Sequence, residues 1–372
     1  MLGNLPLKAR LVTITGLLTT GALLGADVAN ADESSFSNFT PLAVSAGPTA
    51  TEATPITPIT FGNPALVQRS IADRTAQLAA NKTNSGNWDM NTLNETGRDK
   101  GRFLFTVFET GQSGVQRHDL ETGTTDTIWQ SPTFLGHVAF DASYWTPWGT
   151  LLFAEETTGG RLFEAFIDEL TGGGIFKFVP DRRGDLSEGQ LYAIKAANAD
   201  GTGAFQWIPL DRNAVKVNAR AEAAAKGASG YERPEDVEVI GPNLYVAITG
   251  TDRVIQIDLN KNVVTNYVRA GVNVGVETIP TVTGFNNPDN LAQGPDGRLW
   301  IVEDNDYSDI FVADSDVDGN GVADAVHLFA SLKDTGAEGT GIYFGKDPKT
   351  LFVNIQHPDK TLADGTWMIT RR

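Results

Sequence analysis

The most regular repeat unit of this chain is Tyr231-Glu-Arg-Pro-Glu-Asp-Val-Glu-Val239, followed by Gly241-Pro-Asn-Leu-Tyr-Val-Ala-Ile-Thr249. A charged loop leads into a short alternating strand, a Gly-Pro-Asn turn follows, and an apolar strand comes next. Similar turn-plus-apolar-strand copies occupy residues 101–109, 148–156, 295–304 and 346–356. Short β-rich runs that return roughly every 50 residues are typical of the blades of a β-propeller.

Units of this kind begin near residues 101, 149, 190, 236, 291 and 342. This spacing predicts an all-β fold, a six-bladed β-propeller with short helical insertions. The unit at residues 190–195 is the least regular, and the alanine-rich stretch 211–230 that follows it predicts a helix. A β-sandwich is the alternative all-β architecture, but it would not explain a repeat of this length.

The first 31 residues have the features of an export signal. Lys8 and Arg10 precede an apolar run over residues 11–26, and Ala29-Asn-Ala31 offers small residues for cleavage. The apolar run is short for a membrane span, and the two basic residues are not adjacent as in a twin-arginine signal. We therefore expect a Sec-type signal peptide over residues 1–31, cleavage before Asp32 and a secreted or periplasmic protein.

Residues 32–100 are expected to form a low-complexity linker and N-terminal extension. The stretch from 49 to 60 is rich in Thr and Pro, which disfavours a packed core. A single polar helix is expected over residues 65–80, and loop over 81–100. The propeller domain is then expected to span residues 101–372.

The charge balance and the absence of cysteine exclude several functional classes. With 46 acidic and 29 basic residues, the net charge is −17, so nucleic acid and anionic membrane surfaces are disfavoured as partners. Because there is no cysteine, thiolate metal sites, cysteine nucleophiles and disulfides are excluded. We expect a monomer that does not insert into membranes.

Three of the loops that precede alternating strands carry related polar residues: 232–236, 286–291 and 335–340. In a propeller the first strand of each blade lines the central channel, so these loops open at one mouth of that channel. Carboxylates are the preferred ligands of hard cations such as Ca²⁺, and arginine binds phosphate or carboxylate bidentately. An isolated Arg-Pro-Glu-Asp is more often a surface salt-bridge loop. Here, related polar residues recur at the same position of successive blades, which predicts that they meet in one axial pocket.

Several short motifs occur in a characteristic order: Thr146-Pro-Trp-Gly-Thr150, Arg233-Pro-Glu235, Asn287-Pro-Asp-Asn-Leu291, Glu303-Asp304 and Asn354-Ile-Gln-His-Pro358. Together they resemble the PhoX-type bacterial alkaline phosphatases, a family of secreted six-bladed propellers, over residues 101–358. The resemblance implies a phosphomonoesterase with Ca²⁺ and Fe³⁺ ions at the channel mouth.

The resemblance also implies roles for individual residues. It assigns metal ligation to Glu155 or Glu156, Glu235 and Glu338, phosphate contact to Arg233 and Asn290, and the acidic position of the first blade to Glu109. The family holds its iron with a cysteine shortly before the Thr-Pro-Trp-Gly-Thr motif, whereas this chain has Asp141 there. Because a hard oxygen ligand there favours Ca²⁺ or Mg²⁺ over a soft-ligated iron site, Ca²⁺ is the expected metal, and Fe³⁺ stays open without the family's cysteine ligand.

A second metal loop is suggested by Asp314-Ser-Asp316-Val-Asp318-Gly319. Carboxylates at positions 1, 3 and 5 and glycine at position 6 match an EF-hand loop. Position 12 is Ala325, so the bidentate glutamate is missing, although Asp324 at position 11 could replace it. A hairpin loop that binds a structural Ca²⁺ and an ordinary Asp/Gly-rich turn both remain open.

The sequence therefore predicts a secreted, metal-dependent phosphatase that hydrolyses small phosphate monoesters at an axial metal site. One alternative is another metal-dependent propeller hydrolase, lactonase- or esterase-like, which has less need of Arg233. The other is a non-catalytic calcium-binding propeller, for which the missing cysteine is the main argument.

Overall fold

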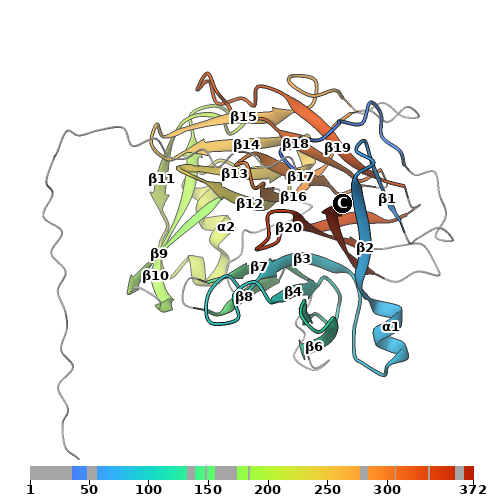
Figure 1. Cartoon of the computed structure of the whole chain (residues 1–372). Helices are drawn as coiled ribbons and strands as arrows, with labels where there is room; N and C mark the ends of the chain where they lie inside the picture. The colour runs from blue at the N-terminus through green and yellow to red at the C-terminus, as the bar shows by residue number, and fades with distance from the viewer. Residues whose placement is uncertain are drawn as a thin grey trace, which may run out of the picture.

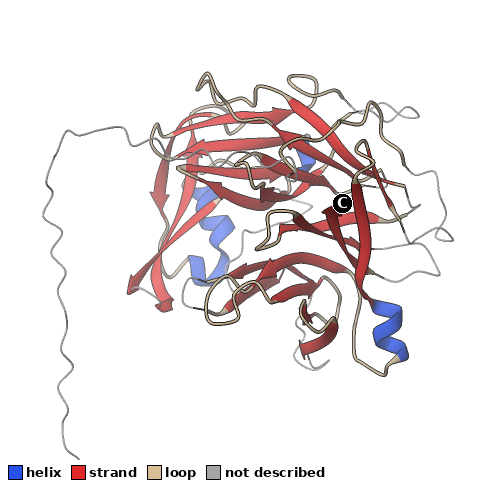
Figure 2. Ribbon diagram, viewed as in Figure 1, coloured by secondary structure: helices blue, strands red, loops and turns tan. Residues whose placement is uncertain are grey.

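The structure is a computed structural model and describes residues 36–47, 57–131, 139–146, 149–155, 174–182, 185–276, 284–305, 307–333, 336–356 and 364–372. Strands dominate these ranges, and helices are few and short (Figure 2). The helical elements are α1 (Arg74–Ala79), α2 (Val215–Ala225) and a 3-10 turn, η1 (Thr249–Thr251). None of the described helices has the length and apolar character needed to cross a membrane. The predicted all-β class is confirmed.

Five sets of consecutive antiparallel strands make up most of the described fold (Figure 1). The first two sets are β3 (Trp88–Leu93), β4 (Phe103–Phe108), β5 (Gly114–Asp119) and β6 (Thr124–Gln130), then β7 (Phe140–Trp145) and β8 (Leu151–Glu155). The third is β12 (Pro234–Ile240), β13 (Asn243–Ile248), β14 (Arg253–Asp258) and β15 (Val263–Arg269). The last two are β16 (Pro288–Gln293), β17 (Leu299–Glu303), β18 (Asp309–Ala313) and β19 (Val326–Leu332), then β20 (Glu338–Phe344), β21 (Thr350–Gln356) and β22 (Gly365–Arg371).

The folded body begins well before residue 101, which corrects the predicted linker over 32–100. Strand β1 (Ile59–Phe61) pairs with β19, and β2 (Leu66–Asp73) pairs with β22. The helix expected over residues 65–80 is confined to α1, because β2 occupies the positions before it. β2 is an outer strand whose centre, Arg69 and Ser70, is exposed, so its sequence lacks the apolar alternation of a half-buried strand.

The segment 36–47 is also part of the fold. The ring of Phe36 packs edge-on against Trp300 and Phe329, and the Leu42 amide donates to the carbonyl of Leu328 over 2.8 Å. Ser45 donates to Asp309 over 3.0 Å. This segment therefore contributes apolar and hydrogen-bonded contacts to the sheet of β16–β19.

The unit predicted near residue 190 is not a separate sheet. It consists of β9 (Phe176–Arg182), β10 (Asp185–Ala196) and β11 (Gly203–Pro209), and β11 pairs with β15 through Gly203 opposite Val264 and Ala204 opposite Val263. The helix predicted over 211–230 is present as α2, and its Ala223 packs with Ala193 and Leu210.

The first strand of each of the five sets lies beside the first strand of another. β12 is next to β16, β16 to β20, β20 to β3, and β3 to β7 (Figure 1). This order is that of five adjacent propeller blades around an axis. Closure of the ring into six blades stays a prediction.

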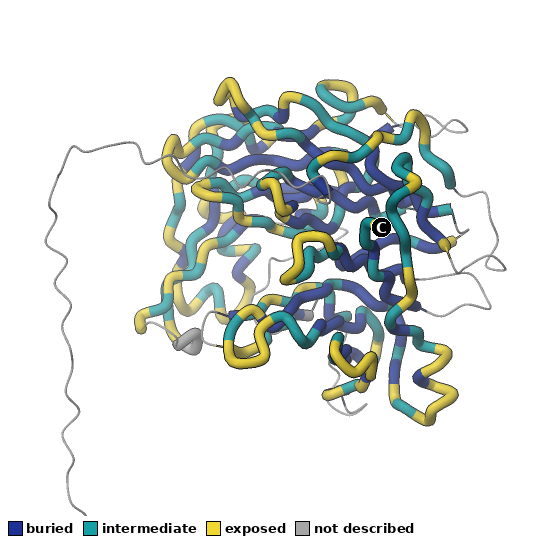
Figure 3. Tube along the Cα trace, in the orientation of Figure 1, coloured by how far each residue is buried: buried dark blue, intermediate teal, exposed yellow. Residues whose placement is uncertain are grey.

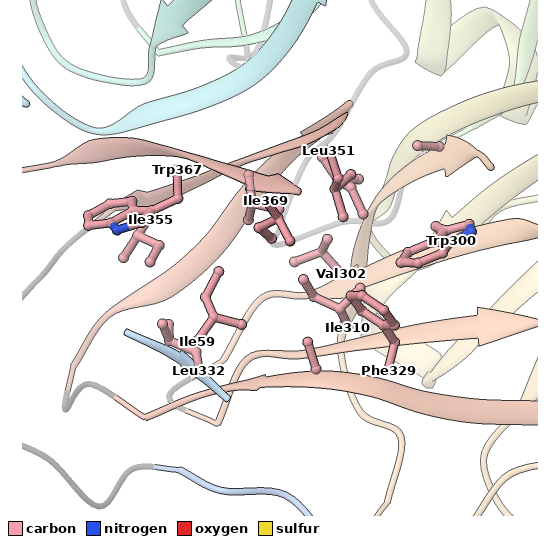
Figure 4. Packing of buried hydrophobic residues seen from close by; sticks show 14 of the residues in the cluster. Ile59, Trp300, Val302, Ile310, Phe329, Leu332, Leu351, Ile355, Trp367 and Ile369 are labelled. Atoms are coloured by element: carbon pink, nitrogen blue, oxygen red, sulfur yellow. The ribbon is translucent and has the colours of Figure 1, made fainter. Parts of the chain in front are cut away.

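The core consists of apolar layers between neighbouring sheets. Figure 4 shows the largest layer, in which Trp300, Val302 and Phe329 of one sheet face Ile355 and Ile369 of the next. Along β21, Leu351, Val353 and Ile355 belong to this layer. Phe352, between them, belongs to a second layer with Leu93 and Leu104. Both faces of this sheet are therefore covered, and the exposed positions concentrate in turns and loops (Figure 3).

Candidate metal centre

The same backbone pattern opens all five of these inner strands. A residue with positive φ is followed by a buried apolar residue or proline and then by a carboxylate. The triplets are Asn87-Trp88-Asp89, Ala139-Phe140-Asp141, Arg233-Pro234-Glu235, Asn287-Pro288-Asp289 and Gly336-Ala337-Glu338. The values of φ at Ala139 and Arg233 are 46° and 48°, a region that residues other than glycine seldom adopt and that costs on the order of 1–3 kcal/mol. The five inner strands therefore begin with the same backbone geometry.

A bulge follows the pattern in four of the five inner strands. The register with the neighbouring strand shifts between residues 88 and 91, 140 and 143, 234 and 237, and 288 and 291. The carboxylates Asp89, Asp141, Glu235 and Asp289 all lie within these shifts. A bulge changes the direction in which a side chain points, so these carboxylates need not follow the in-and-out alternation of the other side chains in the strand.

In three of the five sets, an equivalent backbone hydrogen bond places the residue that follows the second strand of the set beside the triplet. The amides of Glu109, Thr249 and Asp304 donate to the carbonyls of Asn87, Arg233 and Asn287 over 2.8, 2.9 and 2.9 Å. Glu109 and Asp304 thereby add carboxylates to the inner set.

The pKa shifts show that these carboxylates share one region. Burial raises the pKa of Asp89 well above its ordinary value, and the charges of Asp141, Asp289, Glu109 and Glu338 raise it further. Burial likewise raises the pKa of Asp289, with further contributions from Glu235, Asp141, Asp304 and Glu338. We call this set the axial carboxylate cluster: Asp89, Glu109, Asp141, Glu235, Asp289, Asp304 and Glu338.

Glu338 and Asp304 interact directly within the cluster. Burial is the main cause that raises the pKa of Glu338 to about 10, and a hydrogen bond with Asp304 and the charge of Asp304 add to it. The side-chain amide of Gln356 donates to Glu338 and acts in the opposite direction. Without a cation, this carboxyl therefore keeps its proton at neutral pH.

Arg233 is the cation held within the cluster. Its Nε lies 3.0 Å from Oε1 of Glu235, and its Nη2 donates to Oδ2 of Asp304 over 3.0 Å. Burial lowers the pKa of Arg233, but the two carboxylates outweigh this effect and raise it, so the guanidinium stays charged. Its side chain is 28% exposed, and its Nη1 makes no hydrogen bond with a described residue.

Hydrogen bonds between sheets fix the triplets in place. Thr249 Oγ1 donates to the carbonyl of Pro288 over 2.6 Å, and Thr340 Oγ1 donates to the carbonyl of Trp88 over 2.7 Å. These bonds pin the residue before Asp289 and the residue before Asp89. The cluster is thus supported by rigid strands rather than by loops alone.

The donor set fits hard cations. Oδ1 of Asp89 is buried and has no hydrogen-bond partner among the described residues, which is costly for a carboxylate oxygen unless another charge compensates it. Seven carboxylates lie close enough for their charges to act on Asp89 and Asp289. Arg233 forms ion pairs with two of them, Glu235 and Asp304. An all-oxygen set of this kind suits hard cations such as Ca²⁺.

Five of the predicted site residues meet in this cluster: Arg233, Glu235, Glu338, Asp141 and Glu109. The backbone of Glu155 pairs with Phe140 at the end of β8, while its side chain and the whole of Glu156 lie outside the described residues. By sequence position, Glu156 corresponds to Asp304, since Glu155 and Glu303 pair with equivalent residues.

Asn290 has a structural role that the sequence did not predict. Its side chain is buried, and its Oδ1 accepts a hydrogen bond from the amide of Gly341 over 2.6 Å. The carbonyl of Gly341 in turn accepts from Nδ2 of Asn91 over 2.7 Å. Asn290 therefore braces three neighbouring inner strands, and its phosphate contact stays a prediction.

Three members of the cluster were not predicted as ligands: Asp89, Asp289 and Asp304. Asp89 lies in a segment expected to be loop. Aligning Asn287-Pro-Asp289 with Arg233-Pro-Glu235 would have placed Asp289, rather than Asn290, opposite Glu235. The shared triplet was thus the signal available in the sequence.

The predicted EF-hand-like loop is only partly assembled. Asp316, Asp318 and Asp324 each place a carboxylate oxygen within 4.8 Å of the others. Asp314 faces elsewhere, because Arg298 donates to it over 3.0 Å and His327 lies 2.9 Å from its other oxygen. The loop stays a predicted Ca²⁺ site, with Asp324 in place of Asp314.

Some solved structures are similar to this chain at low sequence identity and low TM-score. An auxiliary nutrient binding protein from Bacteroides thetaiotaomicron is 13% identical, with 76% of this chain and 69% of that chain covered and a TM-score of 0.42. Virginiamycin B lyase from Staphylococcus aureus is 11% identical over 82% and 99% of the two chains, with a TM-score of 0.39. The calcium-binding protein regucalcin from Agrobacterium tumefaciens is 14% identical over 90% and 93%, with a TM-score of 0.29. These values carry no argument about activity.

No curated protein matches the chain. The family model described as alkaline phosphatase PhoX matches residues 167–276 and 265–359, together a little more than half of the chain. The matched part contains Arg233, Glu235, Asp289, Asp304 and Glu338, and so most of the axial carboxylate cluster. The chain belongs to the PhoX alkaline phosphatase family.

Proposed function

We propose that this chain is an exported, metal-dependent phosphomonoesterase whose catalytic centre is the axial carboxylate cluster of a six-bladed propeller. The observation that carries the proposal is the position of Arg233, held between Glu235 and Asp304 inside a set of seven carboxylates. Membership of the PhoX family supports the reaction class.

The carboxylates of the inner strands are the groups that would hold the cations. Asp89, Asp141, Glu235, Asp289 and Glu338 come from five separate strands, so together they offer oxygen ligands from several directions. Bound cations would supply charge neutralisation at the phosphate oxygens and a lowered pKa of water. Without such neutralisation, this cluster would repel a phosphate dianion.

Arg233 is the residue that we assign to phosphate orientation. Its Nε and Nη2 face Glu235 and Asp304, which fix the plane of the guanidinium. The side chain is partly exposed, and its Nη1, which makes no hydrogen bond with a described residue, can donate to an equatorial phosphate oxygen. A fixed donor of this kind lowers the cost of ordering the substrate.

A lactonase- or esterase-like hydrolase is the second candidate. The presence of Asp141 where the family has its cysteine favours it, because an all-carboxylate set suits Ca²⁺ without iron. Such a hydrolase would use the same carboxylates but would depend less on Arg233.

The discriminating experiment compares p-nitrophenyl phosphate with a γ-lactone after chelation and after return of Ca²⁺ or Fe³⁺. We expect Ca²⁺ to restore hydrolysis of the phosphate ester and Arg233→Lys to weaken it at least tenfold. Hydrolysis of the lactone alone would replace this proposal with the second candidate. Cation binding without turnover of either compound would support a non-catalytic propeller.

A further inference from the structure

A cavity of about 530 Å³ lies apart from the axial carboxylate cluster. It lies between the sheet of β3–β6 and the sheet of β2, β22, β21 and β20, and residues 345–347 after β20 border it. Glu338 is at the opposite end of β20, about 20 Å away along an extended strand. A volume of this size is ordinary for a small-molecule site.

The floor of the cavity is apolar. Ile71, Leu120 and Met368 line it as partly buried side chains, packed against the apolar layer that includes Phe352. Apolar surface left open in a cavity favours an occupant that can remove it from water.

His118 adds a buried polar group to the lining of the cavity. It is only 4% exposed, and its Nδ1 lies 2.6 Å from Oγ1 of Thr125. The other ring nitrogen, Nε2, has no hydrogen-bond partner among the described residues, and the imidazole borders the cavity. An occupant of the cavity can therefore hydrogen-bond to this ring nitrogen, which no described residue engages.

The charges at the rim are unevenly engaged. The guanidinium of Arg69 forms no hydrogen bond or ion pair with a described residue. Among the described residues, the ammonium of Lys346 donates to the carbonyl of Lys100, over 3.4 Å. The two acidic residues beside these cations, Glu121 and Asp347, already have partners. Glu121 pairs with Arg102 over 3.1 Å, and Asp347 accepts from the amide of Lys349 over 3.0 Å. Two exposed cations are thus available at the cavity, in a chain whose net charge is −17.

We propose that this cavity binds a small organic anion with an apolar body. The acidic head group, carboxylate or phosphate, lies between Arg69 and Lys346 and reaches the ring of His118. The apolar body covers Ile71, Leu120 and Met368. The site does not depend on the metal centre or on the reaction proposed for it.

Calorimetric titration of the full chain with octanoate and with octyl phosphate tests the proposal. Both titrations are run in chelator with the Asp289→Asn variant as the background, so that the axial cluster holds no Ca²⁺ and does not process the phosphate ester. We expect at least one acid to bind, while acetate and octylammonium do not. The acid that binds more tightly identifies the head group.

Matched variants locate the site. Arg69→Ala and Lys346→Ala should each weaken binding about tenfold, whereas Lys349→Ala, in the same turn but outside the cavity, should not change it. In NMR spectra of the four histidines, one imidazole should shift on titration and the shift should be lost in His118→Gln. Equal binding of octylammonium, unchanged binding in both cavity variants, or no binding of either acid would overturn the proposal.

Discussion

Arg233 and Asp304 lie 71 residues apart and on different sheets, yet Nη2 of Arg233 donates to Oδ2 of Asp304 over 3.0 Å. Arg233 precedes β12, and Asp304 follows β17. The contact joins two neighbouring sheets within the axial carboxylate cluster, and Nε of the same guanidinium lies 3.0 Å from Oε1 of Glu235. The contact therefore joins the carboxylate cluster to the guanidinium that we propose contacts phosphate.

Two substitutions of Arg233 distinguish the effect of its charge from the effect of its backbone strain. Arg233→Ala and Arg233→Gly both remove the guanidinium, so both should raise the inhibition constant of inorganic phosphate at least tenfold while Ca²⁺ content is retained. Glycine adopts a φ of 48° without penalty, so Arg233→Gly should be more stable than Arg233→Ala by about 1 kcal/mol in urea unfolding. If the alanine variant is the more stable of the two, the positive φ is not an intrinsic part of the site.

Asp289→Asn tests a carboxylate that the sequence analysis did not assign. Asp289 is buried and has four carboxylates near it. Removing its charge should therefore lower Ca²⁺ affinity about 10- to 100-fold. Glu232→Gln is the control, because Glu232 is exposed and precedes the Arg233 triplet without belonging to the cluster. The measurement is metal content after equilibration in buffered Ca²⁺. Equal loss in both variants would mean that overall charge, not the cluster, sets the affinity.

Gly341→Ala tests the support beneath the cluster. An added Cβ at Gly341 would lie 2.4 Å from the carbonyl oxygen of Asp89 and 2.6 Å from Nδ2 of Asn354. Gly241 has a comparable φ, 61° against 54°, but open space around it. Gly341→Ala should therefore cost about 2–4 kcal/mol in unfolding free energy, and Gly241→Ala about 1 kcal/mol. A Gly341→Ala variant as stable as the control would show that the inner strands move apart readily.

His118 predicts a pH dependence of stability. Burial is the main cause that lowers its pKa to about 4, so between about pH 6.5 and pH 4 the unfolded chain binds a proton that the folded chain does not. The unfolding free energy should thus fall as pH drops through this window, by up to about 3 kcal/mol more than in His118→Gln. Parallel urea unfolding of both proteins at pH 7 and pH 4.5 measures the difference. Identical pH profiles would mean that the imidazole is not desolvated.

The repeat in the sequence was sufficient to predict the all-β class and most of the apolar strands, because those strands carry the core. It was not sufficient for β2, whose outer position leaves Arg69 and Ser70 exposed and removes the apolar alternation. It also could not show that β11 pairs with β15, since edge pairing depends on backbone groups rather than side chains.

The candidate site was predictable only where residue classes recurred. Arg233, Glu235 and Glu338 were found because they lie at the same phase of the repeat, at the entry to an inner strand. Asp89 was missed because residues 81–100, which are rich in Asn, Thr and Gly, were expected to form a loop. The feature that unites the five carboxylates is a positive φ two residues earlier, and Ala139 and Arg233 at that position give no sign of it in the sequence.

Hydrolysis of p-nitrophenyl phosphate during stepwise return of Ca²⁺ to the chelated full chain tests the central claim most directly. The rate should rise with Ca²⁺ occupancy from background to a plateau, and Asp289→Asn should need at least tenfold more Ca²⁺ to reach half of its own plateau. A rate that is independent of Ca²⁺, or one that Asp289→Asn leaves unchanged at every concentration, would contradict the claim that the axial carboxylate cluster is the catalytic metal centre.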